Sequence, residues 1–412
     1  MSTEENDALA RSRPAEAYAS SRRQVVMAGK TICLPKAGRT PPHWIVRIIP
    51  SLVLLWIQIA LGSACTAVPS GPRVVAEWEA AIGTLVAYPF EIPGQLLAEL
   101  AGEGRLFVIV QPDQSEAAQA AIKAAGVPPS KVTLIPTTTK TPWVRDYGAH
   151  TAVRPDGSAV LVDADYVETP IFERGAPPVH LGQELRYPDR SPEDDRTPQD
   201  VARALGLQRV PIEAFVTGGN FLVDGRGTAF CTVAFLDENR TRLSDDELRR
   251  RLRLRLGIER LVVLENTEPI GIQHIDCWLK ILDAGRLLVK RAPADHPEFA
   301  PIERNVALLS KLKSALGRPY EILRIDCPVC GTHDDLATGQ SLPTLPAYTN
   351  ALILNRSVFI PLFGCAGDEE ALATWRAAMP GHRVVGIPSA DWKPYDALHC
   401  RTRAVFAVGT RK

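Results

Sequence analysis

The stretch ALILNRSVFIPLF, residues 351–363, gives the clearest indication of the fold. It contains two short apolar runs rich in branched and aromatic side chains, which is typical of β-strands. A helical pattern, DEEALATWRAAM (368–379), follows it, and then another strand-like run, HRVVGIP (382–388). This order of strands, helix and strand predicts an α/β domain.

The same alternation recurs from about residue 74 onward. Further strand-like runs lie at residues 80–90, 105–111, 131–136, 158–166, 260–266 and 286–293, and helical patterns at residues 94–104, 115–127 and 244–257. Ser115 and Ser244 are predicted helix N-caps, and Asp224-Gly225-Arg226-Gly227 predicts a hairpin turn. We therefore expect one domain over residues 74–412, with hairpins inserted between its strand–helix units.

Composition and charge exclude one class of partner. The chain has 412 residues, of which 45% are hydrophobic and 23% charged, as in soluble globular proteins. Lys plus Arg and Asp plus Glu both total 47, so the formal net charge is zero. Because nucleic-acid binding requires a basic excess or a basic stripe, we expect no nucleic-acid partner.

The eight cysteines are scattered over a long chain, which excludes a small disulfide-stapled scaffold. Only Cys327 and Cys330 form a close pair, and a lone C-x-x-C lacks the second pair that a zinc site needs. We expect a local disulfide or two packed thiols there, with redox or metal roles as lesser alternatives. Cys231 and Cys365 are expected to be buried core thiols.

The N-terminal region differs from the rest of the chain. Residues 1–44 form a polar leader, expected to be disordered or to precede the true start. Residues 45–65 contain an apolar run from Ile48 to Gly62, preceded by Arg47. This run is shorter than the roughly 20 residues of a membrane span but fits the core of a signal peptide.

The end of this run, Gly62-Ser63-Ala64-Cys65, is similar to a lipoprotein cleavage site with Cys65 as the lipidated residue. We therefore expect export, as an outer-surface or periplasmic lipoprotein with an N-terminal membrane anchor, or as a secreted protein. A buried helix of the folded domain is the alternative interpretation.

Polar residues concentrate in four segments inside or beside strand-like runs. These segments are TPWVRDYGAH (141–150), VTGGNFLVDGRGTAF (216–230), GIQHIDCWLK (271–280) and DALHCRTRAV (396–405). In a strand, residues i and i+2 point to the same face. His274 and Asp276 are therefore expected to project into one site, with Cys277 on the opposite face, buried and inert.

Two carboxylates beside one thiol indicate a cationic substrate. Negative charges would raise the pKa of the thiol and repel the oxyanion of an acyl transfer. A guanidinium group, in contrast, is planar and positively charged, and its paired N–H groups match carboxylates. Asp146 and Asp276 would then hold the guanidinium while Cys400 attacks its carbon. His274 would protonate the departing ammonia and activate water.

Together these motifs, W-x-R-D-x-G, G-G-N followed by D-G-x-G-T, H-x-D and a C-terminal H-C, resemble the agmatine deiminase and bacterial peptidylarginine deiminase family. This family belongs to the guanidino-modifying (pentein) superfamily. The resemblance extends from about Glu77 to Cys400. It implies a mixed α/β fold, a five-bladed propeller of ββαβ units with a narrow central site.

The resemblance also implies roles for individual residues, and no metal or other cofactor. Cys400 is the implied nucleophile, His274 the acid and base, and Asp146 and Asp276 the guanidinium ligands. Gly218 and Gly219 would let the chain approach the site closely. The implied substrate-binding residues are Trp143 in the channel, Asn350 in the pocket, and Asn220 turned toward the site.

Peptide-bound arginine is the expected substrate, because of the export signal and the H-I-D-C-W form of the histidine motif. Arg186, Arg190 and Arg196 would then hold a C-terminal carboxylate; alternatively, Asp194 and Asp195 would reach the substrate. The other substrates that stay open are agmatine, free arginine and a methylated arginine. Amidinotransfer and a non-catalytic cell-surface binding protein also stay open, and the sequence does not give the oligomeric state.

Overall fold

The computed structural model describes residues 71–166, 172–173, 192–240, 242–334 and 341–406. The chain divides into two units, Met1–Thr66 and Ala67–Lys412, and the described residues belong to the second. The predicted leader (1–44) and export segment (45–65) lie outside the described residues and stay predictions. None of the helices within the described ranges is long and apolar enough to cross a membrane.

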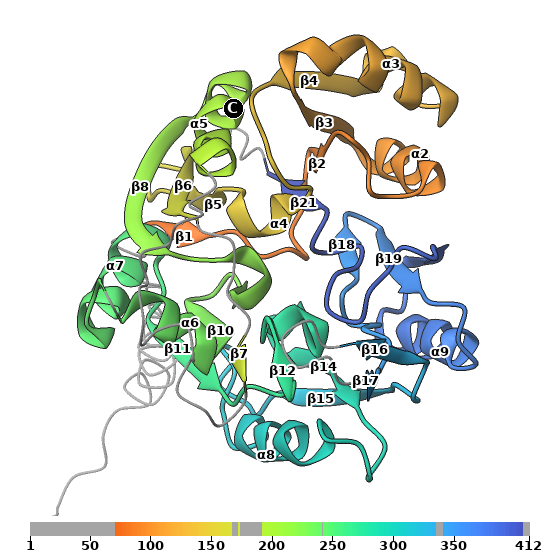
Figure 1. The fold of residues 1–412 in the computed structure, drawn as a ribbon. Coiled ribbons are helices and arrows are strands. Elements are labelled where there is room, and N and C mark those ends of the chain that lie inside the picture. The colour runs from red at the N-terminus through yellow and green to blue at the C-terminus, as the bar shows by residue number, and fades with distance from the viewer. Residues whose placement is uncertain (1–70, 167–171, 174–191, 241, 335–340, 407–412) are drawn as a thin grey trace, which may run out of the picture. The chain divides into compact units, whose positions relative to one another are not determined.

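Among the described residues, five sheets have three or four strands and two sheets have two. Each of the five contains an antiparallel pair, and one strand of that pair is followed in the chain by a helix and a parallel strand. Figure 1 shows the longer helices toward the outside of their sheets. The predicted α/β class is confirmed.

Two of the five sheets have four strands each. One sheet has the order β21 (Arg403–Val405), β2 (Gly83–Ala87), β3 (Arg105–Val110) and β4 (Val132–Pro136), with helices α2 (Gly94–Glu103) and α3 (Ser115–Ala124). The next has the order β1 (Arg73–Val74), β5 (His150–Val153), β6 (Ala159–Asp165) and β8 (Gln208–Phe215), with helix α5 (Pro192–Leu205).

Three further sheets have three strands each. The first contains β9 (Leu222–Val223), β10 (Thr228–Thr232) and β11 (Arg260–Leu264), with helices α6 (Val233–Asn239) and α7 (Asp245–Leu256). The second contains β13 (Leu279–Asp283), β14 (Arg286–Arg291) and β15 (Glu321–Asp326), with helix α8 (Phe299–Leu309). The third contains β18 (Leu352–Leu354), β19 (Ser357–Leu362) and β20 (Arg383–Pro388), with helix α9 (Asp368–Ala378).

Short elements connect the sheets. Two-stranded pairs are β7 (Phe172–Glu173) with β12 (Ile270–Gly271) and β16 (Thr332–Asp334) with β17 (Ser341–Pro343). The remaining helical turns are η1 (Pro112–Gln114), η2 (Pro129–Lys131), α4 (Val144–Tyr147), η3 (Gly218–Asn220) and η4 (Ile275–Cys277).

Several strands that have a neighbouring strand on each edge are buried along almost their whole length. Strands β2 and β10 are buried along their whole length, and β3 is buried in all but its first residue. A strand with both faces covered has no polar side to present, which explains the continuous apolar runs in the sequence. The fully buried Trp375 donates its indole N–H to the carbonyl of Tyr348 at 3.1 Å, which satisfies the polar atom of this core side chain.

Helix α7 begins and ends as the sequence predicts. The hydroxyl of Ser244 accepts a hydrogen bond from the N–H of Glu247, and Gly257 ends the helix with a φ of 68°. The N-cap prediction for Ser115 is wrong. That residue is the first of α3, and its hydroxyl donates to the carbonyl of Pro112 because a 3₁₀ turn precedes the helix.

The predicted hairpin turn lies between β9 and β10. The N–H of Asp224 donates to the carbonyl of Thr228, and the side chain of Asp224 accepts the N–H groups of Arg226 and Thr228. Gly225 and Gly227 have φ of 67° and 93°, values that only glycine adopts without strain.

The cysteines do not pair as expected. Cys330 forms a disulfide with Cys365, with a Cα–Cα distance of 5.9 Å, and Cys327 is a buried free thiol. The predicted local bridge within C-x-x-C is therefore wrong, and so is the core-thiol prediction for Cys365. The disulfide joins the loop after β15 to the loop between β19 and α9. Cys231 is a buried free thiol, as expected.

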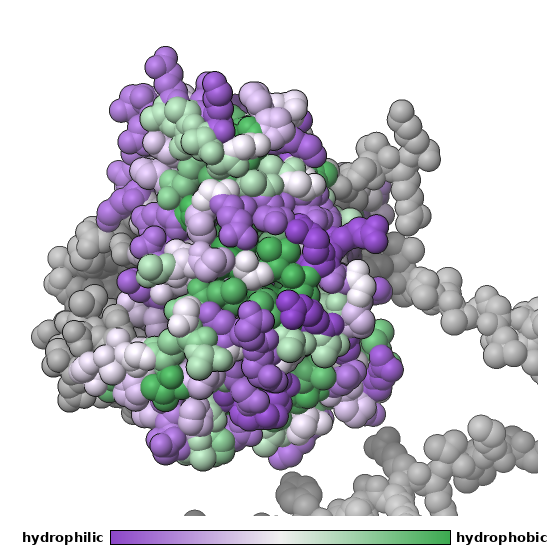
Figure 2. All heavy atoms as spheres, turned by 90° about the vertical axis from the view of Figure 1, so that its right-hand side faces the viewer, coloured by the Kyte–Doolittle hydropathy of each residue, from purple (hydrophilic) through white to green (hydrophobic). Residues whose placement is uncertain are grey.

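Figure 2 shows the face of the molecule that lies on the right of Figure 1, where α2, α3 and α9 lie. Hydrophilic side chains cover most of this face, and hydrophobic side chains gather near its middle. In α9, the acidic residues Asp368, Glu369 and Glu370 form the first turn, whereas the apolar residues Leu372 and Trp375 are buried.

The disulfide generates a prediction about stability. Replacing both Cys330 and Cys365 by Ser should lower the free energy of unfolding by about 4 kcal/mol, because the bridge closes a loop with a sequence separation of 35. Denaturant titration without reductant measures this change. The wild-type protein in dithiothreitol should approach the double variant, and reductant should leave the double variant unchanged. A free Cys330 thiol in non-reducing peptide mapping would contradict the pairing.

Candidate functional site

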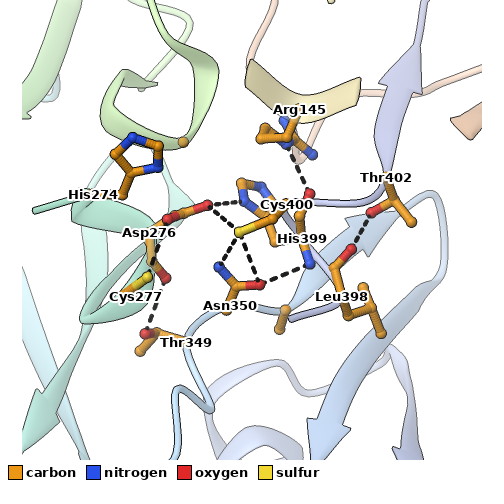
Figure 3. A network of polar contacts seen from close by, with 12 residues as sticks. Arg145, His274, Asp276, Cys277, Thr349, Asn350, Leu398, His399, Cys400 and Thr402 are labelled. Carbon is orange, nitrogen blue, oxygen red and sulfur yellow. Dashed lines mark hydrogen bonds and ion pairs between the residues drawn. The ribbon is translucent and has the colours of Figure 1, made fainter. Parts of the chain in front are cut away.

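The four polar segments meet in one place (Figure 3). The 3₁₀ turn η3 contacts both α4 and η4. The pairing of β21 with β2 fixes the chain just after Cys400, and the carbonyl of Cys400 accepts the N–H of Arg145 at 3.1 Å. Residues from four distant parts of the sequence therefore form one buried polar centre.

Cys400 is a buried thiol in the middle of this centre, with 2% of its surface exposed. The amide nitrogen of Asn350 lies 3.3 Å from its sulfur, and an Asp276 oxygen lies 4.0 Å from it. Burial, followed by the charges of Asp276, Asp396 and Asp146, raises the pKa of Cys400 well above its usual value. The raised pKa favours the thiol form of Cys400.

Asp276 is completely buried and hydrogen-bonded to the residue that precedes the cysteine. Its Oδ2 lies 2.6 Å from Nδ1 of His399, and its backbone carbonyl accepts the hydroxyl of Thr349 at 3.2 Å. Burial alone would raise the pKa of Asp276, but the hydrogen bond and charge of His399, with His274 and Arg145, lower it. Asp276 is therefore a buried anion.

Asp146 lies in the same centre but behaves differently. Its Oδ1 accepts the N–H of Gly219 at 2.9 Å and lies 3.9 Å from Nδ1 of His274. Burial raises the pKa of Asp146 to about 6; the charge of His274 opposes this shift and that of Asp276 adds to it. Asp146 therefore loses its charge under mildly acidic conditions, whereas Asp276 does not.

Gly219 lies where the side chains converge. A Cβ atom at this position would be 2.6 Å from Nδ1 of His274, 2.8 Å from Oδ1 of Asp146 and 3.3 Å from Oδ2 of Asp276. At Gly218 it would be 2.0 Å from the carbonyl oxygen of Arg145. The expected close approach of both glycines to the site is confirmed.

Glu77 is a functional residue that sequence reasoning missed as a member of the site. Its Oε2 lies 2.6 Å from Nε2 of His399 and 3.0 Å from Arg145, and its Oε1 lies 2.5 Å from the Lys280 amine. Burial alone would raise the pKa of Glu77, but Lys280, His399 and Arg145 hold it well below its usual value.

The sequence gives only weak signals for this ion network. Arg145 and His399 belong to the W-x-R-D-x-G and H-C motifs, but neither motif names a partner. Lys280 has a basic side chain in a strand-like run, and it is 2% exposed and donates to the carbonyl of Ala351. A buried lysine in a strand requires a nearby anion. The place of Lys280 in a strand-like run was therefore the signal that could have predicted an acidic partner.

Cys277 is nearer to the site than expected. Residues 275–277 form the 3₁₀ turn η4, so the strand alternation used for His274, Asp276 and Cys277 does not apply. The sulfur of Cys277 lies 3.6 Å from Oδ1 of Asp276 and 3.7 Å from the carbonyl of Tyr395. Its predicted place on the opposite face is wrong, because the same carbonyl lies 3.9 Å from the sulfur of Cys400.

Three predicted substrate-binding residues lie in or beside this centre. The carbonyl oxygen of the Asn350 amide accepts the N–H of His399 at 2.9 Å, while its nitrogen faces Cys400. Trp143 is half-buried at the start of α4. Asn220 belongs to η3, but both ends of its amide bond to Thr232, at 2.9 and 3.0 Å. The role of each in substrate binding stays a prediction.

The acidic residues of the predicted substrate segment have structural partners. They lie in the first turn of α5, which the sequence analysis missed because Pro192, Pro198 and a cluster of charges obscure the helical pattern. Asp194 is fully buried and accepts hydrogen bonds from the Thr139–Thr141 loop, three of them at 2.7–2.9 Å. Asp195 accepts the N–H of Tyr166 at 2.8 Å.

The predicted arginine clamp is only partly described. Arg196 is exposed on α5, and Arg186 and Arg190 lie outside the described residues. Contact of any of the three with a substrate carboxylate stays a prediction.

A search for metal ligands gives no candidate in the part of the chain that the structure describes. No group of three or more His, Cys, Asp or Glu side chains there has an arrangement that could hold a metal ion. The chemistry available to the centre is that of a buried thiol, two carboxylates and a histidine, which suits covalent attack on a bound cation.

Known sequences resemble this chain over part of their length. A putative agmatine deiminase of Vibrio parahaemolyticus is 27% identical over 239 residues, which cover 53% of this chain and 66% of that protein. A putative agmatine deiminase of a Marinomonas species is 25% identical over 52% of this chain and 62% of its own length. The chain thus spans slightly less than two thirds of these curated relatives.

Solved structures resemble almost the whole described part. The agmatine deiminase of Enterococcus faecalis superposes with a TM-score of 0.68 at 20% identity, over 82% of this chain and 97% of that one. A putative arginine deiminase of Porphyromonas gingivalis has a TM-score of 0.64 at 20% identity, over 81% and 98%. At this identity the likeness shows a common fold.

A family model also matches most of the sequence. The model described as Porphyromonas-type peptidyl-arginine deiminase matches residues 73–405, from the first described strand to the last. With this match over four fifths of its length, the chain belongs to the Porphyromonas-type peptidyl-arginine deiminase family of the guanidino-modifying (pentein) superfamily.

Proposed function

We propose that this chain hydrolyses a guanidino group and releases ammonia. The observation that carries this proposal is the position of Cys400, a buried thiol beside the carboxylate of Asp276 in a centre that also holds Asp146 and His274. A guanidinium between the two carboxylates would bring a positive charge next to the sulfur. This charge would lower the pKa of Cys400 and favour the thiolate where the substrate is bound.

The reaction then proceeds in two steps. The thiolate of Cys400 attacks the guanidino carbon, and the C–N bond to one amino group breaks as His274 donates a proton to the departing ammonia. This leaves a thiouronium on Cys400. Water, deprotonated by His274, attacks the same carbon, the C–S bond breaks, and a ureido product leaves with the thiolate restored. Asn350 holds the sulfur through its amide N–H.

Agmatine is the substrate best supported by the comparisons. The two curated relatives described above are named putative agmatine deiminases, and the solved structure from Enterococcus faecalis is named an agmatine deiminase. The expectation of peptide-bound arginine has less support, although the family model carries the name of a peptidyl-arginine deiminase. We therefore propose agmatine deimination first and peptidylarginine deimination second.

Export of the protein stays a proposal, and the disulfide supports it. Structural disulfides form and persist in oxidising compartments and are rare in the cytosol of most organisms. The Cys330–Cys365 bridge fits an exported enzyme, either lipidated at Cys65 or secreted. If thiol trapping in living cells found both cysteines reduced, the argument for export would be lost.

The five-bladed propeller also stays a proposal. Five sheets in the described ranges share the ββαβ order, which is the repeat that such a propeller requires. A crystal structure in which these sheets do not surround one axis would contradict it.

The substrate proposal is tested by measuring ammonia and ureido product with four guanidines. The panel is agmatine, free arginine, a peptide ending in arginine and a peptide with internal arginine. We expect the highest kcat/KM for agmatine. If only the peptide ending in arginine is turned over, the second proposal holds instead. If no guanidine is turned over but one binds, the chain is a non-catalytic binding protein.

The nucleophile is tested by Cys400→Ala. Turnover should fall by at least about 10⁴-fold, because removing a covalent nucleophile removes the whole covalent path. Calorimetric binding of the substrate should persist. The matched control is Cys277→Ala, which removes a thiol against the same carbonyl and should change turnover by less than about tenfold. Equal losses in the two variants would show that Cys400 is not the nucleophile.

The raised pKa of Asp146 predicts the pH dependence. Below about pH 6 this carboxyl binds a proton, loses its charge and no longer attracts the guanidinium. The kcat/KM should therefore fall about tenfold for each pH unit below 6. Circular dichroism over the same range controls for unfolding. A flat profile between pH 5 and pH 7 in folded protein would contradict the role of Asp146.

A further inference from the structure

The imidazole of His399 lies between two carboxylates. Its Nδ1 is 2.6 Å from Oδ2 of Asp276, and its Nε2 is 2.6 Å from Oε2 of Glu77. A carboxylate oxygen only accepts, so each contact of this length needs its own proton. Burial, with the charges of Arg145 and Lys280, lowers the pKa of His399, whereas Glu77 and Asp276 act in the opposite direction. Both short contacts are satisfied when each ring nitrogen carries a proton, so the geometry favours an imidazole that is protonated on both nitrogens.

Both ring nitrogens of His399 are occupied and its side chain is fully buried. A general acid or base must reach the substrate or its leaving group with a free nitrogen. His399 has none, and it faces Asp276 from the side away from His274 (Figure 3). The function that remains is to act on Asp276.

We propose that His399 is a positioning residue, which Glu77 holds so that its Nδ1–H keeps Asp276 charged and oriented for the substrate guanidinium. This inference rests on the proposed function, since it assigns the cation that Asp276 binds. It adds a residue pair to the site, Glu77 and His399, whose effect on the substrate passes through a third side chain.

Glu77 is itself held from three directions. Arg145 and Lys280 contact its carboxylate at 3.0 and 2.5 Å, and the N–H of Ile353 donates to Oε1 at 3.0 Å. Four donors thus fix one carboxylate, which leaves it a single orientation. A carboxylate fixed in this way orients the imidazole, as a carboxylate that accepts the far N–H of a metal-binding histidine orients that ring.

Glu77 also borders a small cavity that the reacting groups do not line. This cavity of about 60 Å³ is lined by Glu77, Arg145 and Lys280 together with Arg403 and Gly218, but not by Cys400, Asp276, Asp146 or His274. Glu77 therefore acts from behind the site, through His399, and not by touching the substrate.

Other charged groups surround this chain and enter any pH profile. They are Asp146, His274, Arg145, Lys280, Cys277 and Cys400 around Asp276 and His399, with Arg403, Asp396 and Glu268 farther out. The test must therefore separate the effect of His399 on the pH profile from the effects of these groups. Replacing His399 by two different amides, Gln and Asn, achieves this separation.

The experiment compares His399→Gln with His399→Asn. The amide of Asn places an N–H near the position of Nδ1 and keeps the bond to Asp276, whereas the amide of Gln reaches the position of Nε2 and keeps only the contact with Glu77. We expect His399→Gln to raise the KM for the guanidine by about 10- to 100-fold, the value of one hydrogen bond to a charged group. The increase in KM caused by His399→Asn should be at least tenfold smaller than the increase caused by His399→Gln.

The pH profile provides a readout that a structural defect would not produce. Without the N–H from His399, the pKa of Asp276 rises, so at low pH the kcat/KM of His399→Gln should fall more steeply than the tenfold per pH unit that Asp146 alone causes. In His399→Asn this slope should remain near that of wild type. Equal KM values and equal acid limbs in the two variants, with both folded by circular dichroism, would overturn the proposal.

A second measurement on the wild-type protein does not depend on turnover or on variants that fold. In protein labelled with ¹⁵N-histidine, the ring of His399 should give two strongly downfield N–H signals, one for each short contact. Both should disappear in His399→Gln and in His399→Asn. Absence of these signals in wild type would overturn the proposal even if the enzyme turns over agmatine.

Failure of the proposed function gives a different result. If the wild-type protein hydrolyses no guanidine while the two downfield signals are present, the network exists. The affinities of Cys400→Ala, Cys400→Ala/His399→Gln and Cys400→Ala/His399→Asn for agmatine then decide whether it positions Asp276. Loss of affinity only with Gln supports the inference, and equal affinities overturn it.

Discussion

The site depends on the ion pairs that the buried carboxylate of Glu77 forms. This carboxylate pairs with Arg145 and Lys280 and contacts His399, and these partners come from α4, β13 and the segment before β21. Moving charges out of water costs several kcal/mol for each ion, and only close pairing offsets that cost. The ionic centre is therefore favourable only when all of these segments are in place, which makes the positions of Cys400 and Asp276 a property of the whole fold.

Two aspartates with the same expected role have pKa values shifted in opposite directions. Both are buried, yet Asp276 has a lowered pKa and Asp146 a raised one. The difference lies in the partners. Asp276 has the ring of His399 at 2.6 Å, whereas Asp146 has one backbone N–H from Gly219 and a histidine at 3.9 Å. One carboxylate is thus a fixed anion, and the other is an anion whose charge depends on its surroundings.

Much of the centre could be predicted from the sequence because its residues belong to local motifs. Cys400, Asp276, Asp146 and His274 converge as the chemistry of a guanidinium site requires, although the strand predicted at residues 274–276 is a 3₁₀ turn. Helices with clear caps and an apolar stripe, such as α7, could also be placed within a residue or two.

The remaining features depend on contacts between distant residues, which spacing does not encode. The partner of Cys330 is 35 residues away, and a second cysteine at position 327 made the wrong local pair the obvious choice. Glu77 is far in sequence from every group it holds. Helix α5 was missed because its charges and prolines mask its periodicity, and with it the structural roles of Asp194 and Asp195.

The pairing of β21 with β2 joins parts of the chain that a ribosome makes at very different times. Gly83 pairs with Val405, and Cys400 lies just before the strand that forms this pair. Domains generally fold as units, so the sheet that contains β2 is complete only after β21 has been synthesised. Cys400 therefore reaches its place beside Asp276 together with the last strand of the domain.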